Sequence, residues 1–215
     1  MAQRTIKVYS DYKSPYAYLA KDLAYELERE TGAQLDWLPY TLDIPAYLGS
    51  ANVDAQGNVL EESRNAHQWR RVKYSYMDCR REANRRGLTI RGPKKIFDSS
   101  LANTGMLYAK RHGVFRPYHD LVFERFWKRE LDIESAAALA AVLGECGADT
   151  QALSTFLESE GRQHLQAIQR EAEAAGVFGV PSFLLEDGDL YWGREHLPHI
   201  RELLARHGLS NRRAQ

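Results

Sequence analysis

The sequence has few cysteines, no excess of charge of either sign and no long hydrophobic run, and each of these deficits excludes a class of protein. Two cysteines in 215 residues, Cys79 and Cys146, are too few for a disulfide framework. The longest uninterrupted apolar run covers residues 136–143, which is far short of the roughly 20 residues of a membrane-spanning helix. With 29 basic and 29 acidic side chains the net charge is zero, so the chain as a whole lacks the basic excess of a nucleic-acid-binding protein.

The composition is otherwise ordinary for a globular protein, since 44% of the residues are hydrophobic, 11% aromatic and 27% charged. A chain of this length can bury a hydrophobic core without disulfides or a structural metal, so we expect a single folded unit. Residues 1–5 lead directly into a strand-like segment and lack the apolar stretch of a secretory signal. We therefore expect a cytoplasmic protein that does not cross a membrane.

The basic residues are distributed unevenly along the chain. Residues 64–95 hold 11 Lys and Arg against two Asp and Glu, and the remainder holds 18 basic and 27 acidic side chains. Such a segment is either a solvated helix that pairs with acidic neighbours or the wall of a site for a small anion. A nucleic-acid ligand is disfavoured, because no nucleic-acid-binding motif accompanies the basic residues.

Local patterns at the two ends of the chain predict strands and helices in a definite order. Residues 5–9 alternate as in a strand, Pro15 suits the first turn of a helix that ends at Gly32, and residues 34–38 form a second strand. The apolar stripe of this helix leaves Lys21 outside it. Near the other end, Asp187-Gly188 predicts a hairpin of residues 182–185 and 190–192, followed by a helix over residues 195–207. Five helical segments are expected between these ends, at residues 64–87, 100–113, 117–128, 133–146 and 150–176.

This order of a βαβ unit, a helical insertion and a ββα unit predicts an α/β protein. It resembles the thioredoxin fold as elaborated in the DsbA superfamily. Ser14-Pro15-Tyr16-Ala17 stands at the strand-to-helix turn where DsbA-like oxidoreductases have Cys-x-x-Cys. Residues 176–183 look like the segment that holds the family's cis-proline, here Pro181, although a plain edge strand also accepts a proline. The resemblance implies a single DsbA-like unit, with residues 1–60 and 177–215 as its thioredoxin-like part and residues 61–176 as a helical insertion.

Neither position of the Cys-x-x-Cys pair holds sulfur in this sequence. Ser14 replaces the nucleophilic cysteine and Ala17 the resolving one, so thiol–disulfide exchange cannot occur at this turn. A hydroxyl at a helix N-terminus lies among unpaired N–H groups at the positive end of the helix dipole, which favours a bound anion. The same field lowers the pKa of a thiol brought by a ligand, and Ser14 would donate a hydrogen bond to that thiolate. Cys79 and Cys146 fall in helical patterns and are expected to be small buried hydrophobes.

Within this superfamily the chain is similar to the 2-hydroxychromene-2-carboxylate isomerases and to their relatives, the kappa-class glutathione transferases. In that branch a serine of an Asp-x-x-Ser-Pro-Tyr/Phe segment contacts the sulfur of glutathione, and residues 11–16 here read Asp-Tyr-Lys-Ser-Pro-Tyr. Residues 73–81 resemble the isomerases' Lys/Tyr-rich helix with Asp-x-x-Arg, in which Asp78 and Arg81 are spaced to pair on one helix face. Asn103 falls where isomerase-like sequences have Asn.

The resemblance implies a set of glutathione-binding residues. Ser14 would hold the thiolate, and the backbone of Val180, next to Pro181, would bind the peptide part of glutathione. The γ-glutamyl end would meet Arg194, Glu195 and His196, although His196 stands where the family usually has arginine. Asn52 matches by position a glutathione-contacting Asn that the family has in the loop after the second strand. Alternatively, and equally well supported, residues 43–58 are a surface loop without a ligand role.

The implied activity is a glutathione-dependent cis–trans isomerisation of 2-hydroxychromene-2-carboxylate or of a related aromatic carboxylate. An anionic aromatic substrate would suit the basic segment, with Lys73, Asp78, Arg81 and Asn103 as candidate substrate-binding residues. A kappa-type glutathione transferase and a non-catalytic DsbA-like binding module remain as alternatives. The resemblance also allows a homodimer, but no exposed apolar stripe demands one. We expect no metal site, because His196 and His199 lack a third ligand at suitable spacing.

Overall fold

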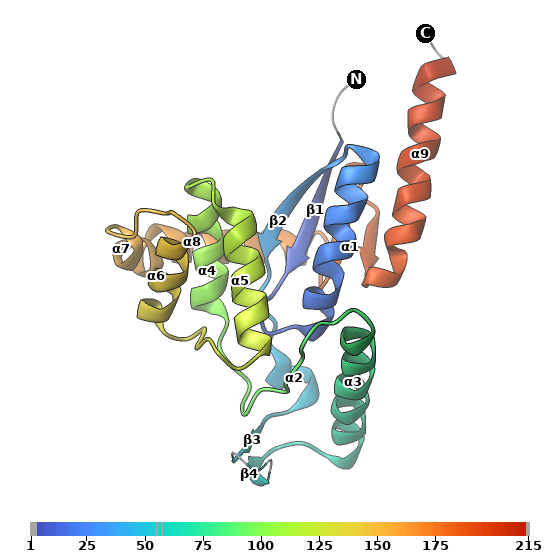
Figure 1. Ribbon diagram of the computed structural model, residues 1–215. Coiled ribbons are helices and arrows are strands. Elements are labelled where there is room, and N and C mark those ends of the chain that lie inside the picture. Colours follow the sequence, from blue (N-terminus) through green and yellow to red (C-terminus); the bar gives the residue numbers. More distant parts are fainter. Residues whose placement is uncertain (1–3, 55, 57, 214–215) are drawn as a thin grey trace.

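A four-stranded mixed sheet forms the centre of the molecule. The computed structural model (Figure 1) describes residues 4–54, 56 and 58–213, with side chains as far as Arg206. Residues 1–3, part of the stretch in which we expect no secretory signal, lie outside this description. Strand β1 (Thr5–Ser10) pairs in parallel with β2 (Gln34–Pro39) and antiparallel with β5 (Ser182–Leu184), which pairs antiparallel with β6 (Leu190–Trp192). The resulting strand order is β2-β1-β5-β6.

Helices α1 (Pro15–Thr31) and α9 (Leu197–Arg213) cover one face of this sheet (Figure 1). The α1 helix begins where Ser14 caps it and Pro15 occupies its first turn, and it ends at Gly32 with a positive φ of 71°, as such boundaries usually do. Apolar residues of both helices and of β1, β2 and β5 share one core, comprising Ile6, Val8, Ala20, Ala24, Leu27, Leu35, Trp37, Phe183, Leu197 and Ile200.

The helical insertion forms a second core beside the β2 edge of the sheet (Figure 1). Its helices are α4 (Ser100–Arg111), α5 (Phe115–Trp127), α6 (Ala136–Glu145), α7 (Leu153–Glu158) and α8 (Glu160–Ala174). Large side chains such as Tyr12, Tyr118, Phe123 and Trp127 are fully buried there. None of the helices in the described part of the chain is long and apolar enough to cross a membrane.

Residues 40–99, between β2 and α4, form a separate segment beyond the N-terminus of α1 (Figure 1), which we call the excursion. It comprises α2 (Ile44–Leu48), the antiparallel pair of β3 (Ala51–Val53) and β4 (Val59–Glu62), and α3 (Ala66–Arg85). Arg86, just after α3, donates a hydrogen bond of 2.8 Å from its guanidinium to the Leu19 carbonyl of α1. This contact ties the end of the excursion to the thioredoxin-like elements of the structure, which are β1, β2, α1, β5, β6 and α9.

The βαβ unit, the helical insertion and the ββα unit occur in the expected order, and the structure differs from the local expectations at four places. Residues 150–176 form two helices, because the backbone of Ser159, with φ of −125° and ψ of −100°, leaves the helical conformation between them. The last helix continues through Gly208 to Arg213, after a short 3₁₀ turn at Arg194–His196. Residues 43–58 contain α2 and β3 instead of loop alone, although residues 55 and 57 lie outside the description. Lys21 is buried because its ammonium group pairs with Asp22 and, at 2.6 Å, with Asp120 of α5.

Candidate active site

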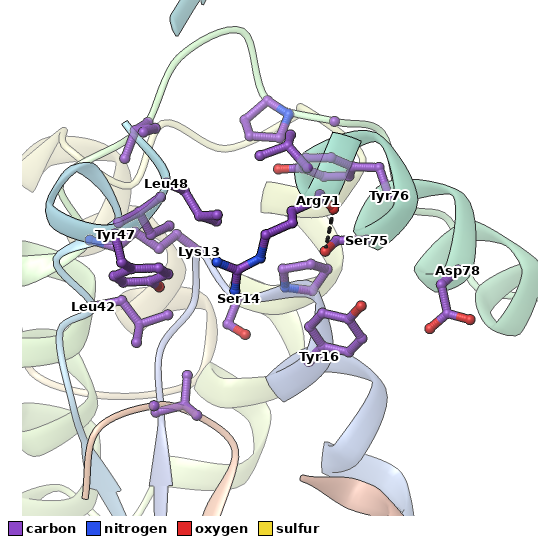
Figure 2. A pocket seen from close by; sticks show the side chains of 18 of the residues that line it. Lys13, Ser14, Tyr16, Leu42, Tyr47, Leu48, Arg71, Ser75, Tyr76 and Asp78 are labelled. Atoms are coloured by element: carbon purple, nitrogen blue, oxygen red, sulfur yellow. Dashed lines mark hydrogen bonds between the residues drawn. The ribbon is translucent and has the colours of Figure 1, made fainter. Parts of the chain in front are cut away.

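A cavity of about 1270 Å³ lies at the N-terminus of α1, between the thioredoxin-like part and the excursion. One side is formed by residues 13–16, 178–181 and 192–195, and the other by side chains from residues 42–53, 64–80 and 92–97. Figure 2 shows side chains of both parts converging on the turn before α1. The cavity therefore brings together segments that are far apart in the sequence.

Ser14 is the N-cap of α1 and lines this cavity. Its Oγ accepts a hydrogen bond of 3.2 Å from the Ala17 amide, and its own amide donates to the Asp11 carbonyl at 3.0 Å. The hydroxyl hydrogen has no acceptor in the described part of the chain. Since the first turn of a helix presents unpaired N–H groups and a positive dipole end, Ser14 offers a free O–H donor at a site that favours an anion.

The turn that positions Ser14 is held by a buried carboxylate, Asp11. This side chain is fully buried and accepts hydrogen bonds from the amides of Lys13 (3.3 Å) and Leu42 (2.8 Å) and from Asn103 Nδ2 (3.4 Å). Burial raises the pKa of Asp11, and Lys13, whose ammonium group lies 3.8 Å from the carboxylate, opposes that rise. Asp11 thus fixes the turn to the segment after β2 and to α4.

Pro181 and Val180 line the cavity opposite the excursion. The Val180–Pro181 peptide bond is cis, as the resemblance implied. Gly193, with a φ of 111°, donates to the Pro181 carbonyl at 2.9 Å. Neither the amide nor the carbonyl of Val180 takes part in a hydrogen bond within the described residues, so both groups are open to a ligand's peptide backbone.

The three residues predicted to meet the γ-glutamyl end divide between the cavity and the surface. Arg194 and Glu195 line the cavity, and the guanidinium of Arg194 lies 5.7 Å from the ring centre of Tyr16. His196 is not among the lining residues, and its ring packs 5.6 Å from that of Tyr191 instead. The residue that departs from the family pattern therefore faces away from the cavity.

The α3 wall contains some of the predicted substrate-binding residues but not all of them. Lys73 and Asp78 line the cavity. Arg81 pairs with Asp78 at 3.7 Å, as its spacing predicted, but its side chain is 66% exposed and lies outside the lining. Arg81 stands on the opposite side of the helix from the buried Val72 and Cys79, because α-helices have 3.6 residues per turn.

Neither predicted asparagine reaches the cavity. Asn52 lies in β3 with an exposed side chain that donates to Glu61 at 3.4 Å, while Ala51 and Val53 on either side of it line the cavity. Asn103 is fully buried beneath the turn, where its Nδ2 donates to Thr41 at 2.9 Å as well as to Asp11. Its position makes Asn103 a support of the Asp11 carboxylate.

Two features of the cavity were not singled out from the sequence. Figure 2 shows the Arg71 side chain extending from α3 across the cavity toward Ser14 and Tyr47. At the rim, the exposed rings of Phe178 and Trp192 pack against each other with their centres 5.0 Å apart. The basic residues of segment 64–95 were the only sequence signal for Arg71, and they did not distinguish it from Arg81.

Comparison with known proteins assigns the chain to a family. Residues 5–205 match the DSBA-like thioredoxin domain. The chain belongs to the DSBA-like thioredoxin family. A 2-hydroxychromene-2-carboxylate isomerase from Sphingobium xenophagum is 27% identical over 202 residues, which is 94% of this chain and 98% of that protein. A solved structure of a 2-hydroxychromene-2-carboxylate isomerase superposes with a TM-score of 0.74 at 22% identity, over 98% of this chain and 99% of the other. The cytosolic disulfide reductase DsbM from Pseudomonas aeruginosa, solved with GSH, gives a TM-score of 0.64 at 16% identity, over 97% and 99%.

The two free cysteines of this DSBA-like chain lie away from Ser14 in sequence. Cys79, on α3, is fully buried, and burial raises the pKa of its thiol to about 12. Cys146 is only partly buried, so the expectation of full burial was wrong for it, because it follows the last turn of α6. Neither cysteine lines the cavity.

Proposed function

We propose that this protein is a glutathione-dependent cis–trans isomerase of the 2-hydroxychromene-2-carboxylate type, acting on that compound or on a closely related aromatic carboxylate. The observation that carries the proposal is a serine hydroxyl, free to donate, at the N-terminus of α1 in a cavity whose charged side chains are mostly basic. The isomerases named above, which align with nearly the whole chain, support the same reaction.

The residues of the cavity fit glutathione. The open backbone groups of Val180 suit its peptide bonds, and the pairing of an extended ligand with such an edge is common in peptide recognition. The Glu195 carboxylate and the Arg194 guanidinium suit the ammonium and carboxylate groups of the γ-glutamyl end. A DSBA-like relative solved with GSH adds support for this choice of thiol.

When bound, glutathione would supply the thiolate nucleophile for a reversible addition to a conjugated carbon of the ring-opened substrate. Rotation about the resulting single bond and loss of the same thiolate would complete the isomerisation with no net change in atoms or electrons. The Ser14 hydroxyl, the Tyr16 amide, which has no partner among the described residues, and the helix dipole of α1 would hold the negative sulfur. Asp11 keeps the turn in place from below. The α3 wall and the Phe178–Trp192 pair at the rim confine the aromatic substrate beside the sulfur.

Isothermal titration with reduced glutathione at millimolar concentration tests the proposal first. Binding heat is expected, and its absence would eliminate both the isomerase and the kappa-type transferase, leaving the peptide-binding module along the Pro181 side. With glutathione bound, turnover of 2-hydroxychromene-2-carboxylate should return free glutathione. A product that retains the glutathionyl group would instead identify a transferase.

A further inference from the structure

The charged side chains of the cavity wall are mostly basic. Among the described residues that line it, two are carboxylates, Asp78 and Glu195, and nine are basic: Lys13, Arg64, Arg71, Lys73, Arg80, Lys94, Lys95, Arg129 and Arg194. A concave site lined by one sign of charge attracts small ions of the other sign. The charge alone does not say which side chain contacts the ion.

Several of these cations are already engaged by the protein. Lys13 lies 3.8 Å from the buried Asp11 carboxylate, and Lys95 pairs with Glu134. Arg64 donates to the Leu48 carbonyl at 3.1 Å, and Arg129 donates to the Gly92 carbonyl at 2.8 Å. Their positive ends are therefore directed at protein acceptors.

Arg71 differs from these side chains in having no carboxylate, carbonyl or aromatic partner among the described residues. It is an exposed residue in the first half of α3, on a backbone fixed by the capping box of Asn65 and Gln68 and by the buried Val72. The Ser75 hydroxyl also donates to the Arg71 carbonyl at 2.9 Å. From this anchored position the side chain crosses the cavity toward Ser14 (Figure 2).

The neighbour of Arg71 across the cavity is a neutral phenol. Burial raises the pKa of Tyr47 to about 12, although Arg71 itself lowers it. Tyr47 therefore stays protonated near neutral pH and does not neutralise the guanidinium. A planar guanidinium without a counter-ion presents two parallel N–H donors, which match a carboxylate and hold it in a fixed orientation.

We propose that Arg71 is the carboxylate-binding residue for the electrophilic substrate, and that it positions the substrate's reacting carbon beside the sulfur held at Ser14. This inference rests on the proposed function for the identity of that substrate. The sulfur would be held by the Ser14 hydroxyl and the Tyr16 amide, so the Arg71 guanidinium is available to a second anion. Arg71 would then select aromatic substrates that have a carboxylate, because only these are held with the reacting carbon beside the sulfur.

The test uses a charged probe and a neutral one of the same shape, trans-cinnamate and cinnamamide, titrated calorimetrically into the full-length protein. The variants are Arg71→Gln, Arg71→Lys and, as a matched control, Arg70→Gln, which removes the same charge from the adjacent, exposed residue outside the cavity lining. The parent should bind cinnamate more tightly than cinnamamide by roughly tenfold to a hundredfold, the range for a hydrogen-bonded charge. R71Q should lose most of that preference, R71K should keep part of it, and R70Q should keep it all.

Retention of the preference in R71Q, its equal loss in R70Q, or its absence in the parent would each overturn the assignment. Glutathione affinity, measured on the same samples, should be unchanged in R71Q. A fall in glutathione affinity with the cinnamate preference intact would assign Arg71 to glutathione instead. Because the cinnamate comparison needs neither glutathione nor turnover, a failure of the proposed function and a failure of this inference give different results.

Discussion

Replacing Ser14 by alanine separates the structural role of this hydroxyl from its proposed chemical role. The substitution removes one oxygen that caps α1 and, under the proposed function, also donates to a thiolate. Ser135 provides a matched control, because it caps α6 by accepting from the Ala138 amide at 3.2 Å, the same distance as between Ser14 Oγ and the Ala17 amide. Ser135 does not line the cavity.

The structural part of the effect should be nearly equal in the two variants. Loss of a serine N-cap typically costs about 1 kcal/mol of unfolding free energy, which corresponds to a Tm lower by about 2–4 °C for a chain of this size. Both Ser14→Ala and Ser135→Ala should show this change in thermal unfolding. Neither should alter the overall fold, because each N-cap interaction is local.

The chemical part should be confined to Ser14→Ala. A hydrogen bond to a charged group contributes about 1.5–3 kcal/mol, so the pKa of the bound thiol should rise by about 1–2 units. Turnover should fall roughly tenfold to a hundredfold if the bond is made to the sulfur in the reaction, while glutathione affinity above the thiol pKa should change less. Ser135→Ala should leave the thiol pKa and turnover unchanged.

Titration of the ultraviolet absorbance of the thiolate, with glutathione bound to each variant, measures the effect directly. The parent and Ser135→Ala should titrate at one pH and Ser14→Ala at a higher pH. If all of them titrate together, or if the parent and Ser14→Ala turn over at equal rates, Ser14 is only a helix cap and the proposed role in sulfur chemistry is refuted.

Further predictions concern the rim, the core and redox conditions. In Gly179→Ala the new Cβ would lie 2.7 Å from Trp192 Nε1. We therefore expect a displaced indole, seen in tryptophan fluorescence, and a loss of unfolding free energy of about 1 kcal/mol. Gly144→Ala places its Cβ in open space and should instead stabilise helix α6 by about 0.4–1 kcal/mol. Burial, and to a lesser extent Lys21 and Arg116, hold the pKa of His119 well below its usual value. As the pH falls below about 6.5, the His119 imidazole therefore takes up a proton in the unfolded chain before it does so in the folded one. The parent should lose unfolding free energy between pH 7 and 5 more steeply than His119→Gln, by up to about 1.4 kcal/mol per pH unit. Equal pH slopes of the two proteins in urea unfolding would contradict this. Dithiothreitol and dithiol oxidants should leave isomerase turnover intact, because positions 14 and 17 hold no cysteine. A measurable insulin-reducing activity would contradict the conclusion that this protein does not carry out thiol–disulfide exchange.

The elements of the thioredoxin-like part were predictable because their signals are local. A proline in the first turn marks the start of α1, a glycine with positive φ its end, and Asp187-Gly188 the hairpin of β5 and β6. The Ser14 position and the cis bond at Pro181 followed from a resemblance to short, contiguous motifs. In each case one segment of the chain contained all of the necessary information.

What could not be predicted depends on contacts between distant segments. Lys21 is buried because Asp120, 99 residues away, pairs with it. The side of α3 that faces the cavity is fixed by only three buried residues, Val72, Cys79 and Ala83, which is a weak periodic signal in a mostly polar helix. Arg81 was therefore predicted at the cavity in place of Arg71, and Asn103 was predicted as a ligand contact when it supports the turn from below.

The division of the cavity wall between two parts of the chain has a consequence for how the site can diversify. The groups proposed for glutathione come from the turn before α1 and from the segments just before β5 and just after β6, which adjoin the sheet and its core. The groups proposed for the second substrate come from α2, β3 and α3, of which α3 buries only Val72, Cys79 and Ala83 and leaves most of its residues at the surface. Under the proposed function, substitutions or length changes in residues 43–97 can therefore exchange one electrophile for another without altering the groups proposed to hold the sulfur at Ser14.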